Sequence, residues 1–243
     1  MCTVTFIPGK EKVFLTSNRD VSTDRFPALP PQSYPCDTGT IFYPRDTAAG
    51  GTWFGVHENG QVLVLLNGGF KFHAPAPPYR KSRGLILLDL LGHESPFNYF
   101  RAISLEYIEA FTLVIWEDEN LFECRWDGER KYAKHLDKTI GHIWSSVTLY
   151  GQEAATRREK WFADWLKDMS DPAQTDVLHF HQFSGTGDSH NDLTMNRDGK
   201  FHTASITNVT ITGTSLDMTY LDLLNNKTYL QPIELNKEWA ARQ

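Results

Sequence analysis

An apolar run in the first third of the chain limits the folds that are open to it. Residues Val62 to Leu66 are apolar without a polar residue at alternate positions, and such a run is typical of a strand that is buried on both faces. The pair Asn59-Gly60 separates it from a β-rich segment, Gly50–Val56. Asn-Gly is the strongest short hairpin signal, because both turn positions favour positive φ. A strand covered on both faces predicts a layered protein.

The rest of the chain alternates between blocks of strands and blocks of helices. We expect strands at Thr3–Ile7, Lys12–Ser17, Gly50–Val56, Gln61–Asn67, Phe111–Trp116, Asn120–Trp126, Lys131–Leu136, Ile143–Tyr150, Thr194–Asn196, Phe201–Thr207, Ser215–Leu223 and Thr228–Leu230. We expect helices at Ser82–Leu91, within Pro96–Ala110, at Gln152–Met169 and at Thr175–Phe183, and a helix-prone tail from Asn236. Short turns between neighbouring strands indicate antiparallel sheets. The sequence therefore predicts an α+β fold, a four-layer αββα sandwich of antiparallel sheets, as a single domain over residues 1–243.

Five prolines fall within Pro27–Pro44 and interrupt this alternation. Proline cannot donate to a strand ladder and breaks helices, so we expect an extended surface segment here. A long irregular loop of this kind is either a linker or a segment that covers a binding site.

Composition excludes several classes of protein. The formal net charge of −6 lacks the basic excess of proteins that bind nucleic acid. The 3 cysteines are far apart and form no Cys-x-x-Cys pair, so we expect free thiols without a disulfide framework or a zinc knuckle. Because we find neither a secretory signal nor an apolar run of about 18 residues, we expect a cytoplasmic protein without membrane insertion. The sequence indicates no cofactor and leaves the oligomeric state open.

The N-terminus carries the strongest chemical signal. Cys2 directly follows Met1, and a residue as small as cysteine permits removal of the methionine. Cys2 would then carry a thiol and a free α-amine, which titrate at about pH 8.5 and about pH 7.7–8.0, so that a nucleophile and a base occur on one residue. The second expected strand runs directly into Asn18-Arg19-Asp20. This combination predicts an N-terminal-nucleophile amide hydrolase.

Several motifs together resemble a known family. The opening Met1-Cys2-Thr3, the segment Ser17–Asp20, the segment Gly50–Gly55 and the hairpin that leads to Leu66-Asn67 are similar to the NRDE family, also called the transport and Golgi organisation protein 2 family. The likeness is dense over the first 70 residues or so and loose afterwards. That family in turn resembles N-terminal-nucleophile hydrolases of the choloylglycine hydrolase type, which implies the αββα fold.

The resemblance also implies roles for individual residues. It makes Cys2 the nucleophile, places Arg19 and Asp20 beside the thiol, and puts the amide of Asn67 at the oxyanion. Apart from the roles that the resemblance implies, we expect four residues to contact the substrate: Asn18, Trp53, Gly68 and Phe70. The substrate itself would be a small-molecule amide or acyl compound.

This sequence departs from the family pattern at three places. Val21 follows Asp20 where the family usually has glutamate, and the relatives lead us to expect an asparagine near Ser145-Ser146 and an arginine near Ala204-Ser205. These departures leave open a non-catalytic protein of the same fold that binds a small molecule or a lipid-derived acyl group.

Two further hypotheses depend on histidine. One of the 9 histidines could activate a cysteine in a Cys-His thiol hydrolase that needs no removal of Met1. His179, His181 and His190 could be metal ligands, but residues i and i+2 diverge on the helix expected here, and we therefore expect no metal site.

Overall fold

The computed structural model describes residues 3–213 and 215–235. These residues form two compact units, each built around one seven-stranded antiparallel sheet. The first unit comprises the chain up to Arg25 together with Thr139–Glu234, and the second comprises Phe26–Lys138. Cys2 and the tail from Asn236 lie outside the described residues.

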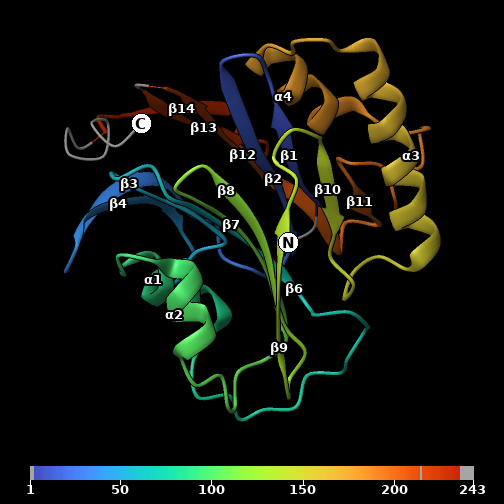
Figure 1. Cartoon of the computed structure of the whole chain (residues 1–243). Coiled ribbons are helices and arrows are strands. Elements are labelled where there is room, and N and C mark those ends of the chain that lie inside the picture. The colour runs from blue at the N-terminus through green and yellow to red at the C-terminus, as the bar shows by residue number, and fades with distance from the viewer. Residues whose placement is uncertain (1–2, 214, 236–243) are drawn as a thin grey trace. The chain divides into compact units, whose positions relative to one another are not determined.

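The sheet of the first unit combines strands from the first and the last parts of the sequence (Figure 1). In spatial order its strands are β10 (His142–Ser145), β1 (Thr3–Pro8), β2 (Lys12–Ser22), β12 (Phe201–Thr212), β13 (Leu216–Asp222) and β14 (Lys227–Ile233), with β11 (Asn196–Arg197) paired to β12. Strand β2 is longer than predicted, because it pairs with β12 along its whole length and therefore includes Asn18-Arg19-Asp20. Strand β10 is shorter than the predicted Ile143–Tyr150, since the chain turns where the N–H of Tyr150 donates to the carbonyl of Ser146.

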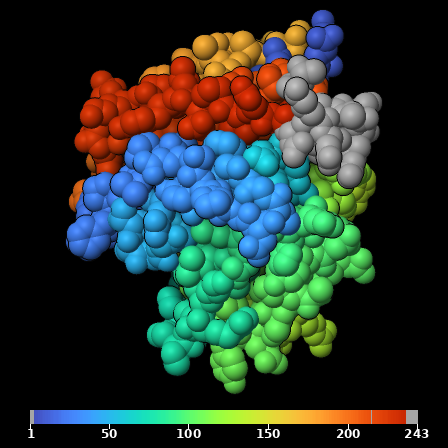
Figure 2. All heavy atoms as spheres, turned by 90° about the vertical axis from the view of Figure 1, so that its left-hand side faces the viewer, coloured from blue at the N-terminus to red at the C-terminus, as the bar shows by residue number. Residues whose placement is uncertain are grey.

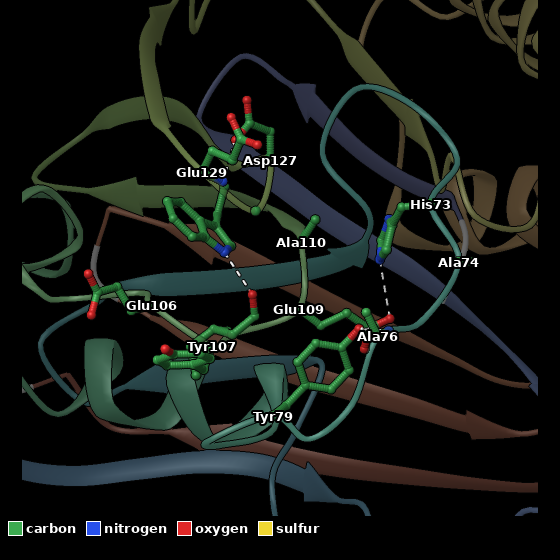
Figure 3. Close-up of a pocket in the computed structure, with 13 residues that line it drawn as sticks. His73, Ala74, Ala76, Tyr79, Glu106, Tyr107, Glu109, Ala110, Asp127 and Glu129 are labelled. Carbon is green, nitrogen blue, oxygen red and sulfur yellow. Dashed lines mark hydrogen bonds and ion pairs between the residues drawn. The ribbon is translucent and has the colours of Figure 1, made fainter.

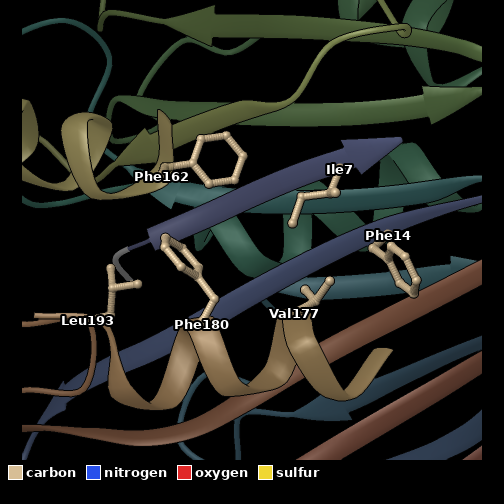
Figure 4. Close-up of a cluster of buried hydrophobic side chains, with 6 residues drawn as sticks. All are labelled: Ile7, Phe14, Phe162, Val177, Phe180 and Leu193. Carbon is tan, nitrogen blue, oxygen red and sulfur yellow. The ribbon is translucent and has the colours of Figure 1, made fainter. Parts of the chain in front are cut away.

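Two helices, α3 (Gln152–Asp168) and α4 (Gln174–Phe183), pack on this sheet, α3 on β10 and α4 on β2 and β12. The apolar cluster beneath them joins the strands to the helices, and Figure 4 shows its members. They are Ile7, Phe14, Phe162, Val177, Phe180 and Leu193. Alternate residues of a strand point to the same face. Ile7 of β1 points toward the helices, so Thr3 and Thr5 lie on that helix-covered face as well. Phe14 of β2 also points toward the helices, which places Asn18 and Asp20 on the same face.

The sheet of the second unit is a meander in sequence order. Its strands are β3 (Leu29–Cys36), β4 (Gly39–Arg45), β5 (Phe54–His57), β6 (Val62–Asn67), β7 (Phe111–Glu117), β8 (Asn120–Trp126) and β9 (Lys131–Leu136). Residues Val62 to Leu66 are buried, as the unbroken apolar run predicts. In the loop between β5 and β6 only Gly60 has a positive φ, 90°, so the connection differs from a two-residue turn.

The segment Pro27–Pro44 is extended and much of it is exposed, as predicted, but it forms the strands β3 and β4, so its interpretation as a linker or an irregular loop is wrong. Proline is tolerated in β3 because this strand lies at the edge of the sheet, where one side needs no ladder hydrogen bonds. The register shifts between Leu29 and Gln32, where two consecutive prolines stand. Much of β3 is exposed, and the blue residues of Figure 2 show this part of the chain at the surface.

Helices α1 (Arg83–Leu91) and α2 (Pro96–Ala102) belong to the second unit, α1 packing on β5 and β6 and α2 on β7. The side chain of Ser82 caps α1 by accepting from the N–H of Leu85, and Gly92 ends the helix as predicted. The segment Pro96–Ala110 contains one helix, which ends at Ala102.

The α+β fold of antiparallel sheets is thus confirmed, with four helices among the described residues, two in each unit. The single domain over the whole chain stays a prediction. None of the helices in the described parts of the chain is long and apolar enough to span a membrane.

Candidate functional site

Strand β2 holds three of the predicted site residues in the interior of its sheet. Asn18, Arg19 and Asp20 are 0%, 2% and 4% exposed. Alternation along the strand directs Asn18 and Asp20 to the helix-covered face and Arg19 to the opposite face. The structure therefore separates Arg19 from Asp20 by the thickness of the sheet, although they are neighbours in sequence.

The side chain of Asn18 docks helix α4 onto the sheet. Its Nδ2 donates to the carbonyl of His181 at 3.0 Å and to that of Leu193 at 2.7 Å, while its Oδ1 lies 2.5 Å from Nδ1 of His181. Both amide hydrogens and the carbonyl oxygen of Asn18 are therefore engaged. These contacts support a structural role, and contact with a substrate stays a prediction.

His181 completes this buried contact. Its Nε2 lies 2.7 Å from the hydroxyl of Thr5 on β1, so one ring joins β1, β2 and α4. Burial, and after it the positive charge of Arg158, lowers the pKa of His181 from 6.5 to about 3. The ring is therefore neutral at physiological pH, with one nitrogen as donor and one as acceptor.

The carboxylate of Asp20 accepts two short hydrogen bonds from hydroxyl groups. The hydroxyl of Tyr150 donates to Oδ2 at 2.7 Å and that of Thr203 to Oδ1 at 2.5 Å. Thr203 lies directly opposite Asp20 in the β2–β12 pairing, just before a shift of register in β12. A carboxylate fixed on both oxygens is a well-oriented acceptor for a further donor.

Arg158 of α3 is a member of this polar group that the sequence analysis missed. Its side chain is 0% exposed, its Nη1 donates to the hydroxyl of Thr3 at 2.6 Å, and its guanidinium stacks 3.5 Å from the ring centre of Tyr150. The signal was present in the sequence, because Arg158 stands four residues after Ala154 and four before Phe162, the other two buried residues of the helix.

On the opposite face of the sheet, Arg19 lies near two side chains that the sequence analysis also missed. Ser205 is the partner of Arg19 in the β2–β12 register, and Tyr220 of β13 is close enough to Arg19 to interact with its charge. The pKa of Tyr220 is raised above its ordinary value, chiefly by burial, against lowering effects of Ser205 and Arg19. Tyr220 is therefore a neutral hydroxyl at physiological pH.

The two described cysteines differ in their surroundings. Cys124 is completely buried, and burial raises its pKa to about 12, which leaves almost no thiolate at neutral pH. Cys36 is partly exposed, and its sulfur lies 3.5 Å from the hydroxyl of Thr38. The burial of Cys124 therefore argues against that residue as a nucleophile.

The second unit holds the predicted oxyanion segment at the end of β6. Gly68 follows Asn67 with φ 84°, and the hydroxyl of Thr112 donates to the carbonyls of Gly68 at 2.9 Å and Gly69 at 3.3 Å. The guanidinium of Arg125 also donates to Gly69 at 2.7 Å. These contacts fix the backbone that follows Asn67.

The two aromatic residues predicted to contact substrate differ in exposure. Phe70 is 49% exposed, stacked under Arg125 at 4.9 Å and edge-on to Tyr132 at 4.9 Å. Trp53 is 1% exposed and lies in the core of the second unit. Of the two, Phe70 is the one that solvent reaches.

The histidines do not gather into a metal site. Among the described residues no three potential ligands come together. His181 is held by Asn18 and Thr5, His190 lies 3.2 Å from Asp198, and His179 packs against Phe183.

A pocket of about 540 Å³ lies in the second unit beside the oxyanion segment. Its wall includes Ala110, whose carbonyl accepts from the N–H of Gly68. In its wall the ring of His73 points at the carboxylate of Glu109, with Nε2 3.3 Å from Oε1 (Figure 3), and Glu109 also pairs with Arg83 at 3.0 Å. The pocket is large enough for part of a small molecule.

Comparison with solved structures identifies the fold. An N-acylethanolamine-hydrolyzing acid amidase ortholog from Caenorhabditis elegans matches with a TM-score of 0.60 and 9% identity, over 85% of this chain and 92% of that chain. A conjugated bile acid hydrolase from Clostridium perfringens, with an arginine replaced, matches with a TM-score of 0.54 and 10% identity, over 97% and 98%. A second variant of that enzyme has its second residue, a cysteine, replaced by alanine. It matches with a TM-score of 0.53 and 10% identity, over 98% of this chain and 98% of that chain. These proteins have the N-terminal-nucleophile hydrolase fold, and this chain shares it.

Comparison of sequences gives one result. The sequence model of the family described as Transport and Golgi organisation 2 matches residues 1–179. Among proteins with curated descriptions, none matches the chain at a significant level.

Proposed function

The chain belongs to the Transport and Golgi organisation 2 family, and from this and the fold we propose that it is a cysteine N-terminal-nucleophile hydrolase. Its substrate would be a small molecule with an amide or other acyl bond. The observation that carries the proposal is the register of β1 and β2, in which Thr3 pairs with Asn18. The strand that directly follows Cys2 in the sequence therefore lies beside the segment that contains Arg19 and Asp20. A cysteine also stands second in the bile acid hydrolase, which supports the assignment of Cys2.

The proposed reaction uses two groups of one residue. After removal of Met1, the α-amine of Cys2 takes the thiol proton and the thiolate attacks the carbonyl carbon of the substrate. The carbon–nitrogen bond breaks, the amine product leaves with the proton, and an acyl thioester remains on Cys2. Water then attacks the thioester, which releases the acid and restores the thiol.

Three other residues assist in this proposal. The positive charge of Arg19 favours the thiolate, and the carboxylate of Asp20, fixed by Tyr150 and Thr203, orients the α-amine. The amide of Asn67 would donate to the oxyanion; loss of one such donor costs about 10²–10³ in kcat, or roughly 2.7–4 kcal/mol.

A screen against pooled amides and thioesters tests the proposal. We expect the wild type to release an acid or amine that Cys2→Ala does not release, and the matched control Cys36→Ala to keep the wild-type rate. Intact mass would confirm that the active protein lacks Met1. Activity that survives in Cys2→Ala would contradict the proposal.

The sequence also supports a second candidate function. Ser145-Ser146 and Ala204-Ser205 stand where the relatives led us to expect an asparagine and an arginine, which favours a protein that binds an acyl compound without cleaving it. Binding of a screened compound without turnover, equal in wild type and Cys2→Ala, would support this candidate. The spaced, unpaired cysteines favour a reducing compartment such as the cytoplasm for either function.

A further inference from the structure

Helix α3 buries a positive charge that the proposed reaction does not yet use. Besides the hydroxyl of Thr3, the guanidinium of Arg158 donates to the carbonyl of Asn191 at 3.1 and 3.0 Å and to that of Asp192 at 2.7 Å. Among the described residues its partners are thus uncharged oxygens, with no carboxylate in ion-pair contact. Burying a charge without an opposite charge is costly, so a methionine or leucine would suit a purely structural position better.

The same helix end also fixes Asp20. Tyr150 stands two residues before α3, and the guanidinium of Arg158 lies over its ring, 3.5 Å from the ring centre. The hydroxyl of Tyr150 donates to Asp20 Oδ2 at 2.7 Å. Arg158 and Tyr150 therefore form a stacked pair that makes two hydrogen bonds, one from Arg158 to Thr3 and one from Tyr150 to Asp20.

Both contacts involve residues that the proposed reaction connects to Cys2. Thr3 follows Cys2 in the sequence, and Asp20 is the carboxylate proposed to receive the α-amine. Building on the proposed function, we propose that Arg158 and Tyr150 are positioning residues of the hydrolase: Arg158 fixes the start of β1 through Thr3, and Tyr150 fixes the carboxylate of Asp20.

The charges on this face also bear on when Cys2 reacts. Arg158 and Arg197, which lies 5.1 Å from the ring of Tyr150, are positive, Asp20 is negative, and the buried His181 is neutral at physiological pH. A nearby cation favours the neutral form of the α-amine of Cys2, which is the form that accepts a proton, whereas the carboxylate of Asp20 favours the protonated form. Arg158 and the Tyr150 hydroxyl that donates to Asp20 both weaken this effect of the carboxylate. Loss of either therefore shifts the pH at which Cys2 reacts to a higher value.

The pH profile of alkylation at Cys2 by iodoacetamide, measured by peptide mass, tests this inference. In Tyr150→Phe and Arg158→Met we expect the midpoint to rise by about one pH unit, while Arg158→Lys, which keeps the charge, stays near the wild type. The matched control is Arg197→Met, which removes a cation 5.1 Å from the ring of Tyr150 whose hydrogen bonds go to the carbonyls of His190 and Leu149, not to Thr3 or Asp20. Its midpoint should rise by less than half as much as that of Arg158→Met.

A milder pair of variants serves where Arg158→Met does not fold. Thr3→Val removes the acceptor but keeps the guanidinium, and Thr5→Val changes the next residue on the same face of β1, whose hydroxyl contacts His181 instead. We expect alkylation of Cys2 about tenfold slower in Thr3→Val than in Thr5→Val, because misplaced reacting groups lose rate.

Two outcomes separate this inference from the proposed function. Profiles of Tyr150→Phe and Arg158→Met that coincide with the wild type, or equal rates in Thr3→Val and Thr5→Val, would overturn the positioning role and leave the hydrolase standing. A wild-type Cys2 that keeps Met1, or that reacts no faster than Cys36, would overturn the hydrolase itself.

Discussion

The buried His181 gives the stability of this protein a calculable pH dependence. Its pKa falls from 6.5 in the unfolded chain to about 3 in the folded chain. The unfolded chain therefore binds a proton that the folded one does not, and the contribution of His181 is fully present above pH 6.5 and is lost as the pH falls towards 3. At about 1.36 kcal/mol per pH unit, the wild type loses about 2 kcal/mol of unfolding free energy between pH 7 and pH 5 through this group.

His181→Asn isolates this contribution. At pH 7 the variant loses contacts to Thr5 and Asn18 and should be less stable by about 1–3 kcal/mol for each hydrogen bond left unmade. At pH 5 the difference in unfolding free energy between the wild type and the variant should be smaller by about 2 kcal/mol, because only the wild type has lost the contribution of the neutral His181.

Urea unfolding at pH 7 and pH 5, followed by circular dichroism, measures both differences. The matched control is His135→Asn, at an exposed histidine of β9, which shows how much of the change follows from removing any histidine. A difference between wild type and His181→Asn that stays constant within about 0.5 kcal/mol at the two pH values would refute a buried, neutral His181.

Three further experiments test other parts of the structure. A Cβ at Gly84 would lie 2.7 Å from a backbone oxygen, so Gly84→Ala should lower the unfolding free energy by about 1–3 kcal/mol, whereas Gly151→Ala, with no atom within 4 Å, should not. Ellman's reagent should label Cys36 in the native protein and Cys124 only after unfolding, and native labelling of both would contradict the burial of Cys124. Glu117 accepts from the N–H of the second residue of α2 at 2.8 Å, so Glu117→Gln should lower the melting temperature by a few degrees, for about 1 kcal/mol; an unchanged value would contradict this.

Patterns that depend on local physics were predictable from the sequence. The unbroken apolar run of β6 requires burial whatever surrounds it, and Ser82 and Gly92 mark the ends of α1 directly. These signals were enough for the α+β fold and for the place of Asn67 at a strand end.

Features that depend on distant partners were not predictable. Proline is acceptable in β3 only because that strand is at the edge of the sheet, and the sequence does not state which strand is the edge. The buried Arg158 of α3 was not predicted, because a buried arginine is rare unless its hydrogen bonds are satisfied by segments far away in sequence. The roles of Asn18 and Asp20 likewise depend on α4 and Tyr150.

The candidate site follows the same division. The type and order of Asn18, Arg19 and Asp20 were evident, but their distribution over two faces follows only from the register of β2 with its neighbours. Asp20 remains the acceptor proposed for the α-amine, and the proposal now includes the hydroxyls that orient it.

The rate at which iodoacetamide modifies each cysteine at pH 7, measured together with the intact mass of the chain, tests the catalytic assignment most directly. We expect a protein without Met1 in which Cys2 reacts at least about tenfold faster than Cys36, since thiolate content sets the rate. A protein that retains Met1, or one whose Cys2 reacts no faster than Cys36, would contradict the assignment of Cys2 as the nucleophile.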